Sequence, residues 1–76
     1  MYIKLKPHKL AITRIKHGLS QRELAKKASL SNGYIAQLEK ESRFPTPKTA
    51  QKICQALGCD FDDLFEIVND EESLAG

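Results

Sequence analysis

The strongest structural signal in the chain lies in residues 19–39, LSQRELAKKASLSNGYIAQLE. Ser20 and Glu23 form a capping box, in which the serine hydroxyl accepts from the backbone N–H of the glutamate. The glutamate carboxylate in turn reaches back to the N–H of the serine. This pattern predicts that a helix begins at once and runs over residues 21–29.

A second short helix follows closely. Ser31 is placed to cap a helix over residues 32–40, and the apolar run breaks between the two helices at residues 29–31. Ala25 and Ala28 are the small inward residues of the first helix, so two helices can cross closely there. A link of about three residues between short helices predicts a helix-turn-helix, although a hairpin in a structural helix bundle shares some of these features.

Start and stop residues on either side predict three further helices, over residues 7–17, 47–57 and 61–68. Pro7 suits a first helical position, and Gly18 and Gly58 suit helix ends. Residues 2–5 alternate like a strand but are too short to found a sheet. We therefore expect an all-α, compact five-helix domain. The expected parts are an N-terminal arm, the helical domain and an acidic, disordered tail, at residues 1–6, 7–68 and 69–76.

Length and composition exclude several classes of protein. The chain has 76 residues, 41% hydrophobic and 29% charged, which is ordinary for one small globular domain. It has neither a membrane-length apolar run nor a signal peptide, so we expect a cytoplasmic protein. We also expect no separate sensor of a small-molecule effector.

The side chains that support catalysis or metal binding are sparse. Cys54 and Cys59 are five apart, and the two histidines lie far from them, so we expect no metal site and no cofactor. Cys54 fits a position in the core, and Cys59 fits a partly exposed thiol in a loop. Nothing else in the sequence supports a redox switch at these thiols. Acidic residues at 62, 63 and 66 fit the first turn of a helix better than a catalytic pair. We expect no enzyme.

Charge is segregated along the sequence. Residues 1–58 hold all twelve Lys and Arg and only three Glu, a formal charge of +9, whereas residues 59–76 carry −7. This distribution favours a body that faces a polyanion and an acidic end that is kept away from it. The alternative is a solvated surface with a tail that promotes solubility.

The helix expected over residues 32–40 has two different faces. At 100° per residue, Ile35 and Leu38 lie on one side, and Gly33, Gln37 and Lys40 lie opposite. Such a helix fits the major groove of DNA, where a glutamine can pair bidentately with adenine. The competing interpretation of Gln37 is a plain solvated surface.

The sequence resembles the phage-repressor/Cro-type (Xre-type) helix-turn-helix family over about residues 8–66. The motifs that carry the resemblance occur in the family's order and spacing: LSQRELA at 19–25, LS at 30–31, YI at 34–35, QLE at 37–39, Arg43, Pro45 and ALG at 56–58. The resemblance implies a five-helix domain that binds double-stranded DNA and usually acts as a dimer on a palindrome. It therefore implies regulation of transcription, by repression or control.

The resemblance also implies roles for individual residues. It implies base contacts at Asn32, Gly33, Tyr34, Ala36 and Gln37. It implies a phosphate contact at Gln21 and a buried ion pair between Arg14 and Glu39 that holds the recognition helix. Two positions depart from the family's pattern: Gly33 replaces a polar reading residue, and Glu41 replaces the Gly or Asn that often ends this helix.

Further polar side chains are expected on phosphates, where they add affinity without sequence information. They flank the two helices of the motif and are Arg22, Ser31, Lys40, Ser42 and Arg43. Lys26 and Lys27 lie along the first of these helices and strengthen the positive field.

The last expected helix carries more apolar surface than its own core contact needs. A homodimer interface is therefore expected at Phe61, Leu64, Phe65, Ile67 and Val68; these residues also fit a role in covering a small core. The alternative function is a helical interaction module, such as an antitoxin or adaptor, that docks a protein partner through its C-terminal segment.

Overall fold

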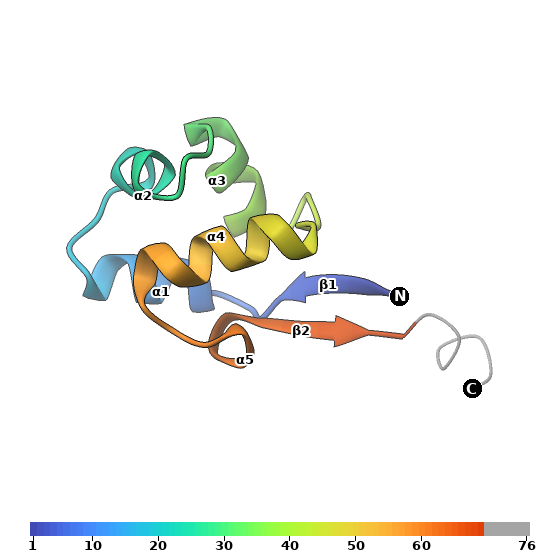
Figure 1. The fold of residues 1–76 in the computed structure, drawn as a ribbon. Coiled ribbons are helices and arrows are strands. Elements are labelled where there is room, and N and C mark those ends of the chain that lie inside the picture. The colour runs from blue at the N-terminus through green and yellow to red at the C-terminus, as the bar shows by residue number, and fades with distance from the viewer. Residues whose placement is uncertain (70–76) are drawn as a thin grey trace.

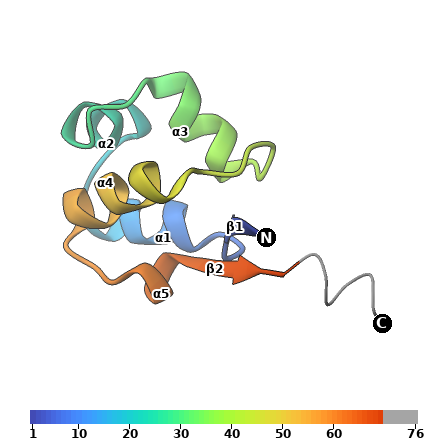
Figure 2. The ribbon, with the colours of Figure 1, turned by 45° about the vertical axis from the view of Figure 1, so that its right-hand side comes forward.

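The computed structural model describes residues 1–69, and the expected tail at residues 70–76 lies outside them. The elements follow one another along the chain as β1 (Tyr2–Leu5), α1 (Lys9–Lys16), α2 (Gln21–Lys27), α3 (Asn32–Glu39), α4 (Pro47–Leu57), α5 (Phe61–Leu64) and β2 (Phe65–Val68). Helices α2 and α3 lie on one side of α4, and the two strands lie on the other (Figures 1 and 2). Within residues 1–69, no helix is both long and apolar enough to cross a bilayer.

A single apolar core holds these elements together. Its largest fully buried side chains come from every helix and from β2, and they are Leu10, Leu24, Ile35, Leu38, Ile53, Leu64 and Phe65. Helix α4 runs through the middle of the fold (Figure 1) and buries Ala50, Ile53, Cys54 and Leu57 along one face. This spacing of three and four residues is that of an amphipathic helix.

Local capping explains where the helices begin. The predicted capping box is confirmed: Ser20 Oγ accepts from the Glu23 N–H at 3.1 Å, and the Ser20 N–H donates to Glu23 Oε1 at 2.9 Å. Ser31 Oγ accepts from the Tyr34 N–H at 3.1 Å. These bonds satisfy N–H groups that have no partner inside the helix. Both helices of the motif therefore begin where the sequence predicts.

The C-terminal part corrects the all-α prediction. Helix α5 ends at Leu64, and residues 65–68, which we expected to be helical, form β2. This strand pairs antiparallel with β1, and Leu5 faces Phe65 in the register. Both of these side chains are buried. Residues 1–6 are thus not a separate arm, because a distant partner stabilises a strand that is too short to form alone.

The start of α1 also differs from the prediction. Pro7 lies in a turn ahead of the helix rather than in its first position, and the Lys9 N–H donates to the Lys6 carbonyl at 3.1 Å. His8 has φ 62°. A proline followed by a residue with positive φ fits a type II turn, which reverses the chain between β1 and α1. Ile15, near the end of α1, is 64% exposed.

Candidate nucleic-acid interface

An ion pair connects α1 to the end of α3. Arg14 Nε donates to Glu39 Oε2 at 2.7 Å, and Arg14 Nη2 donates to Glu39 Oε1 at 3.2 Å. The two side chains are only 13% and 10% exposed. The guanidinium also donates to the Leu19 carbonyl at 2.8 Å, so it links the loop before α2 as well. This is the pair that the resemblance implied, and its two-point geometry fixes the orientation of α3.

Gln21 takes part in the same network. Its Nε2 donates to Glu39 Oε1 at 2.9 Å, so the first residue of α2 is tied to the last residue of α3. The family resemblance implies a phosphate contact at Gln21 and gives no sign of this bond. Gln21 and Glu39 are eighteen residues apart and meet only because α2 and α3 cross, so no local sequence pattern indicates the contact.

The outward surface of α3 is open to solvent. Asn32, Gly33, Gln37 and Lys40 are exposed, and Ala36 is partly exposed. Ile35 and Leu38 on the opposite side are completely buried. The structure thus places the expected reading side chains on the free side of a helix that is packed from behind. Figure 2 shows α2 and α3 together at one extreme of the molecule.

Tyr34 stands at the border between the two faces. Its side chain is partly buried against the core, and its ring faces the Arg43 guanidinium at 5.2 Å from the ring centroid. A cation at this distance from an aromatic ring is attracted to its face. No local pattern in the sequence indicates this pairing, which holds the arginine beside α3.

The end of α3 is closed by hydrogen bonds to its last carbonyls. The Ser42 N–H and Ser42 Oγ both donate to the Gln37 carbonyl, at 3.0 and 3.1 Å, and the Glu41 N–H donates to the Leu38 carbonyl at 3.0 Å. Glu41 has φ 59°, the left-handed conformation that glycine adopts most easily. The Ser42 hydroxyl, expected on phosphate, is thus already used within the protein.

The remaining expected phosphate contacts lie on the surface around this helix pair. Arg22, Ser31, Lys40 and Arg43 are exposed. The Ser31 oxygen caps α3 as an acceptor, which leaves its hydroxyl proton to donate elsewhere. The positive side chains of Arg22, Lys40 and Arg43 are thus open to solvent, where an anionic partner can reach them.

The residues expected at a dimer interface are separated by the fold. Leu64 and Phe65 are 0% exposed within one protomer, so they cannot contact a second copy. Their burial follows from the turn from α5 into β2, which directs both into the core. Ile67 is 61% exposed, and Phe61 and Val68 are partly exposed.

The two cysteines behave as the sequence predicts. Cys54 is buried on α4 and Cys59 is partly exposed after it, and both are free thiols. Burial, with a smaller contribution from neighbouring Cys59, raises the pKa of the Cys54 thiol to about 11. Burial also raises the pKa of Cys59. Both groups therefore stay protonated at neutral pH, the less reactive form. No cluster of metal-ligating side chains occurs among residues 1–69.

Two short crossed helices, with the second open on one face and braced on the other, define the class of helix-turn-helix DNA-binding regulators. The chain belongs to the helix-turn-helix family HTH_3, whose model matches residues 10–64. It is thus a transcription regulator of the Xre/Cro type.

Individual relatives agree with this family. An uncharacterised HTH-type transcriptional regulator of Methanocaldococcus jannaschii is 38% identical over 64 residues, which cover 84% of this chain and 97% of that protein. Another, from Archaeoglobus fulgidus, is 41% identical over 59 residues, covering 78% and 83%.

Solved structures share the fold. The restriction-modification controller protein C.AhdI of Aeromonas hydrophila matches with a TM-score of 0.72 and 26% identity, over 75% of this chain and 86% of that one. The clp gene regulator ClgR of Corynebacterium glutamicum matches with a TM-score of 0.68 and 30% identity, over 75% and 74%. Both of these proteins are named as regulators.

Proposed function

We propose that this protein binds double-stranded DNA sequence-specifically, as a homodimer on a palindromic operator, and thereby represses or controls transcription. The observation that carries the proposal is the division of α3 into an exposed polar face and a fully buried apolar face. With eight residues the helix is roughly 12 Å long, and its width matches a major groove about 12 Å across.

Base reading centres on Gln37. Its amide offers a donor and an acceptor side by side, which match the N6 and N7 edge of adenine. Asn32 lies at the N-terminus of α3 and either reads a base in the same way or holds a phosphate. Tyr34, Ala36 and Gly33 make the remaining base contacts: the tyrosine ring meets a thymine methyl, and the two small residues let the backbone approach.

Phosphate contacts flank this reading face. Arg22, Lys40 and Arg43 supply charge, and Gln21 and Ser31 supply polar groups. Ser42 joins them only when its hydroxyl proton leaves the Gln37 carbonyl for a phosphate. The cation–π contact with Tyr34 supports a role for Arg43 at the edge of the major groove of the DNA. Gln21 reaches a phosphate while it stays bonded to Glu39, because an amide nitrogen carries a second N–H.

The proposal is tested by selecting bound sequences from random duplex DNA and then measuring affinity for the selected site. Gln37→Ala is expected to lose about 1–3 kcal/mol on that site and to relax preference at one base position. The matched control is Gln55→Ala, an exposed glutamine on α4, which should bind like the wild type. Equal, weak binding to all duplexes that survives Gln37→Ala would instead favour the interaction-module function.

A further inference from the structure

The corner between α4 and α5 brings the two cysteines of the chain together. Helix α4 ends with Gly58 as its C-cap, in a left-handed conformation with φ 62° and ψ 37°. The Cys59 N–H donates to the Cys54 carbonyl at 3.1 Å, and the Gly58 N–H donates to the Gln55 carbonyl at 3.4 Å. These two bonds define a Schellman motif, in which the side chains at the ends of the longer loop commonly pack on each other. In this chain both of those side chains are thiols.

The two thiols interact, and they differ in exposure. Burial is the main cause that raises the pKa of both, and a hydrogen bond between them raises the pKa of Cys54 and lowers that of Cys59. These opposite effects are those of a Cys54 S–H that donates to the Cys59 sulfur. Cys54 is 8% exposed and Cys59 is partly exposed. A reagent in solution therefore reaches Cys59 first, although the carboxylates of Asp63 and Asp60 oppose its ionisation by raising its pKa.

The backbone at this corner has the spacing that a disulfide requires. Disulfides join residues whose Cα atoms are about 4.4–6.8 Å apart. A backbone N–H···O bond spans a similar distance, since hydrogen-bonded residues of paired strands have Cα atoms about 5.5 Å apart. Because the thiols of Cys54 and Cys59 are also in contact, rotation about the side-chain bonds is enough to join them.

We propose that Cys54 and Cys59 form a site of thiol–disulfide exchange, at which a low-molecular-weight disulfide, RSSR, produces an intrachain disulfide without unfolding the protein. In the first step the Cys59 thiolate attacks one sulfur of RSSR, forms a mixed disulfide and expels RS⁻. In the second step the Cys54 thiolate attacks the Cys59 sulfur and expels the second RS⁻. The two cysteines together lose two electrons and two protons, and RSSR takes up both and leaves as two molecules of RSH.

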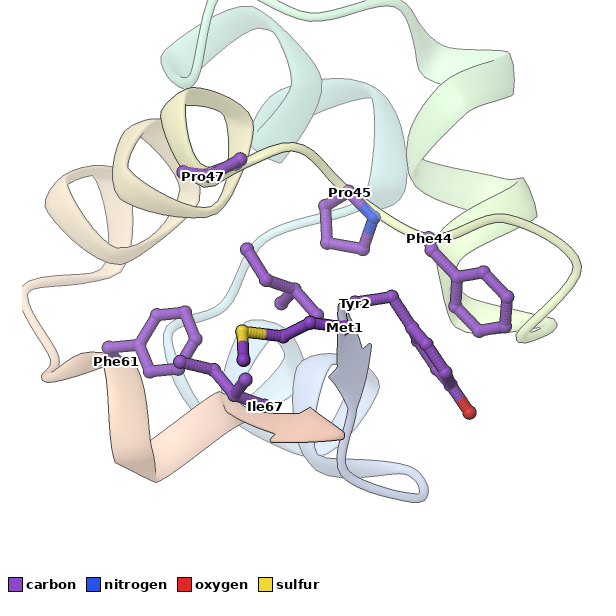
Figure 3. A pocket seen from close by; sticks show the side chains of 8 residues that line it. Met1, Tyr2, Phe44, Pro45, Pro47, Phe61 and Ile67 are labelled. Atoms are coloured by element: carbon purple, nitrogen blue, oxygen red, sulfur yellow. The ribbon is translucent and has the colours of Figure 1, made fainter. Parts of the chain in front are cut away.

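The bridge joins α4 to the segment that leads into α5. Helix α5 has four residues, too few to be stable alone, so its position depends on its neighbours. Its first residue, Phe61, lies beside Phe65 with ring centroids 5.5 Å apart and lines an open apolar groove together with Met1 and Ile67 (Figure 3). The bridge therefore restrains one wall of this groove. Helix α5 lies across α4 from α3 (Figure 1), and the exchange does not depend on the proposed DNA binding.

Mass spectrometry of the folded full chain tests the exchange. The chain is incubated with oxidised glutathione at mildly alkaline pH, where more thiolate is present, and is then quenched with acid. The wild type is expected to lose two hydrogens and to carry no glutathione, and dithiothreitol should restore its original mass. Because the chain has two cysteines, an intrachain disulfide can only join these two. A chain that keeps bound glutathione, stays unmodified or forms a disulfide-linked dimer would overturn the proposal.

Two variants test the order of attack. Cys54→Ala leaves the more exposed thiol and should stop at one mixed disulfide with glutathione. Cys59→Ser leaves only the buried thiol and should react at least about tenfold more slowly. If circular dichroism shows that either variant is unfolded, iodoacetamide labelling of the reduced wild type replaces the pair, and Cys59 should be labelled first. Equal reactivity of the two thiols in either experiment would refute the assignment of Cys59 as the attacking group.

Thermal unfolding shows whether the native fold favours the bond. Folding and oxidation form a closed thermodynamic cycle, so oxidation raises the stability only if the disulfide forms more favourably in the native state than in the unfolded chain. The oxidised wild type is expected to melt about 5–10 °C above the reduced form. An oxidised chain that melts below the reduced one would mean that the bond strains the corner, and it would rule the site out.

Discussion

At the scale of single residues, Glu39 is the most connected polar side chain around the motif. It accepts from Arg14 through both carboxylate oxygens and from Gln21 through one of them. Three elements thus meet at one carboxylate, which is only 10% exposed. A buried charge of this kind is costly when a partner is lost, because the other charge is left without compensation.

We therefore expect Glu39→Gln or Arg14→Met alone to destabilise the fold by about 3–5 kcal/mol. This is a large part of the stability of a small domain, so DNA binding should be lost mainly through unfolding. Urea denaturation measures the effect, with the exposed Glu41→Gln as a control that stays within about 0.5 kcal/mol of the wild type. A Glu39→Gln protein that is fully stable yet fails to bind DNA would contradict this structural role.

At the scale of elements, α3 combines a firm N-cap with a weak first turn. Ser31 caps it, but Gly33 stands in its first turn, where glycine costs up to about 1 kcal/mol relative to alanine. A Cβ at this position would meet no atom within 4 Å. The same open space surrounds Gly58 at the end of α4, but that residue has φ +62°. The two glycines differ in conformation rather than in packing.

This pair of glycines allows a matched prediction. Gly33→Ala should stabilise the protein by up to about 1 kcal/mol, because it lowers the entropy of the unfolded chain at no steric cost. Gly58→Ala should destabilise it by about 1 kcal/mol, because a left-handed conformation strains any Cβ. Thermal unfolding reports both changes. A lower melting temperature for Gly33→Ala would mean that the helix is not regular at this position.

At the scale of the whole molecule, the charges are arranged around the fold. The recognition pair α2 and α3 lies at one extreme, and the strands and α5 lie beyond α4 (Figure 1). The acidic residues of the described C-terminal part, Asp60, Asp62, Asp63 and Glu66, thus stand away from α3. This separation keeps these four carboxylates from competing with phosphates at the proposed DNA face.

Salt dependence tests this arrangement. Each phosphate contact releases counterions, so affinity falls as salt rises. Lys40→Ala is expected to reduce the slope of log affinity against log salt by about one and to weaken binding on all sequences alike. Lys9→Ala, on α1 across the molecule, should leave the slope unchanged. An unchanged slope for Lys40→Ala would place that residue off the DNA.

The helix-turn-helix was predictable because its signals are local. The capping bonds at Ser20 and Ser31 join residues three apart, and the burial of Ile35 and Leu38 follows from their spacing. The face that carries Gln37 was predicted from the same wheel and is exposed in the structure. The Arg14–Glu39 pair was anticipated through a family resemblance, since residues twenty-five apart share no local pattern.

Other features depend on contacts between distant segments. Residues 65–68 form a strand rather than a helix because Phe65 meets Leu5, sixty residues earlier, and no short window contains both. The same contact buries Phe65 and leaves the Ile67 side chain 61% exposed, so Phe65 is not available for the dimer interface that we expected to include it. Gln21 meets Glu39 only because α2 and α3 pack together, and Tyr34 meets Arg43 because the loop after α3 brings the arginine over the ring. Local hydrogen bonding thus specifies where helices begin, whereas long-range burial selects between helix and strand and determines which side chains remain free to bind.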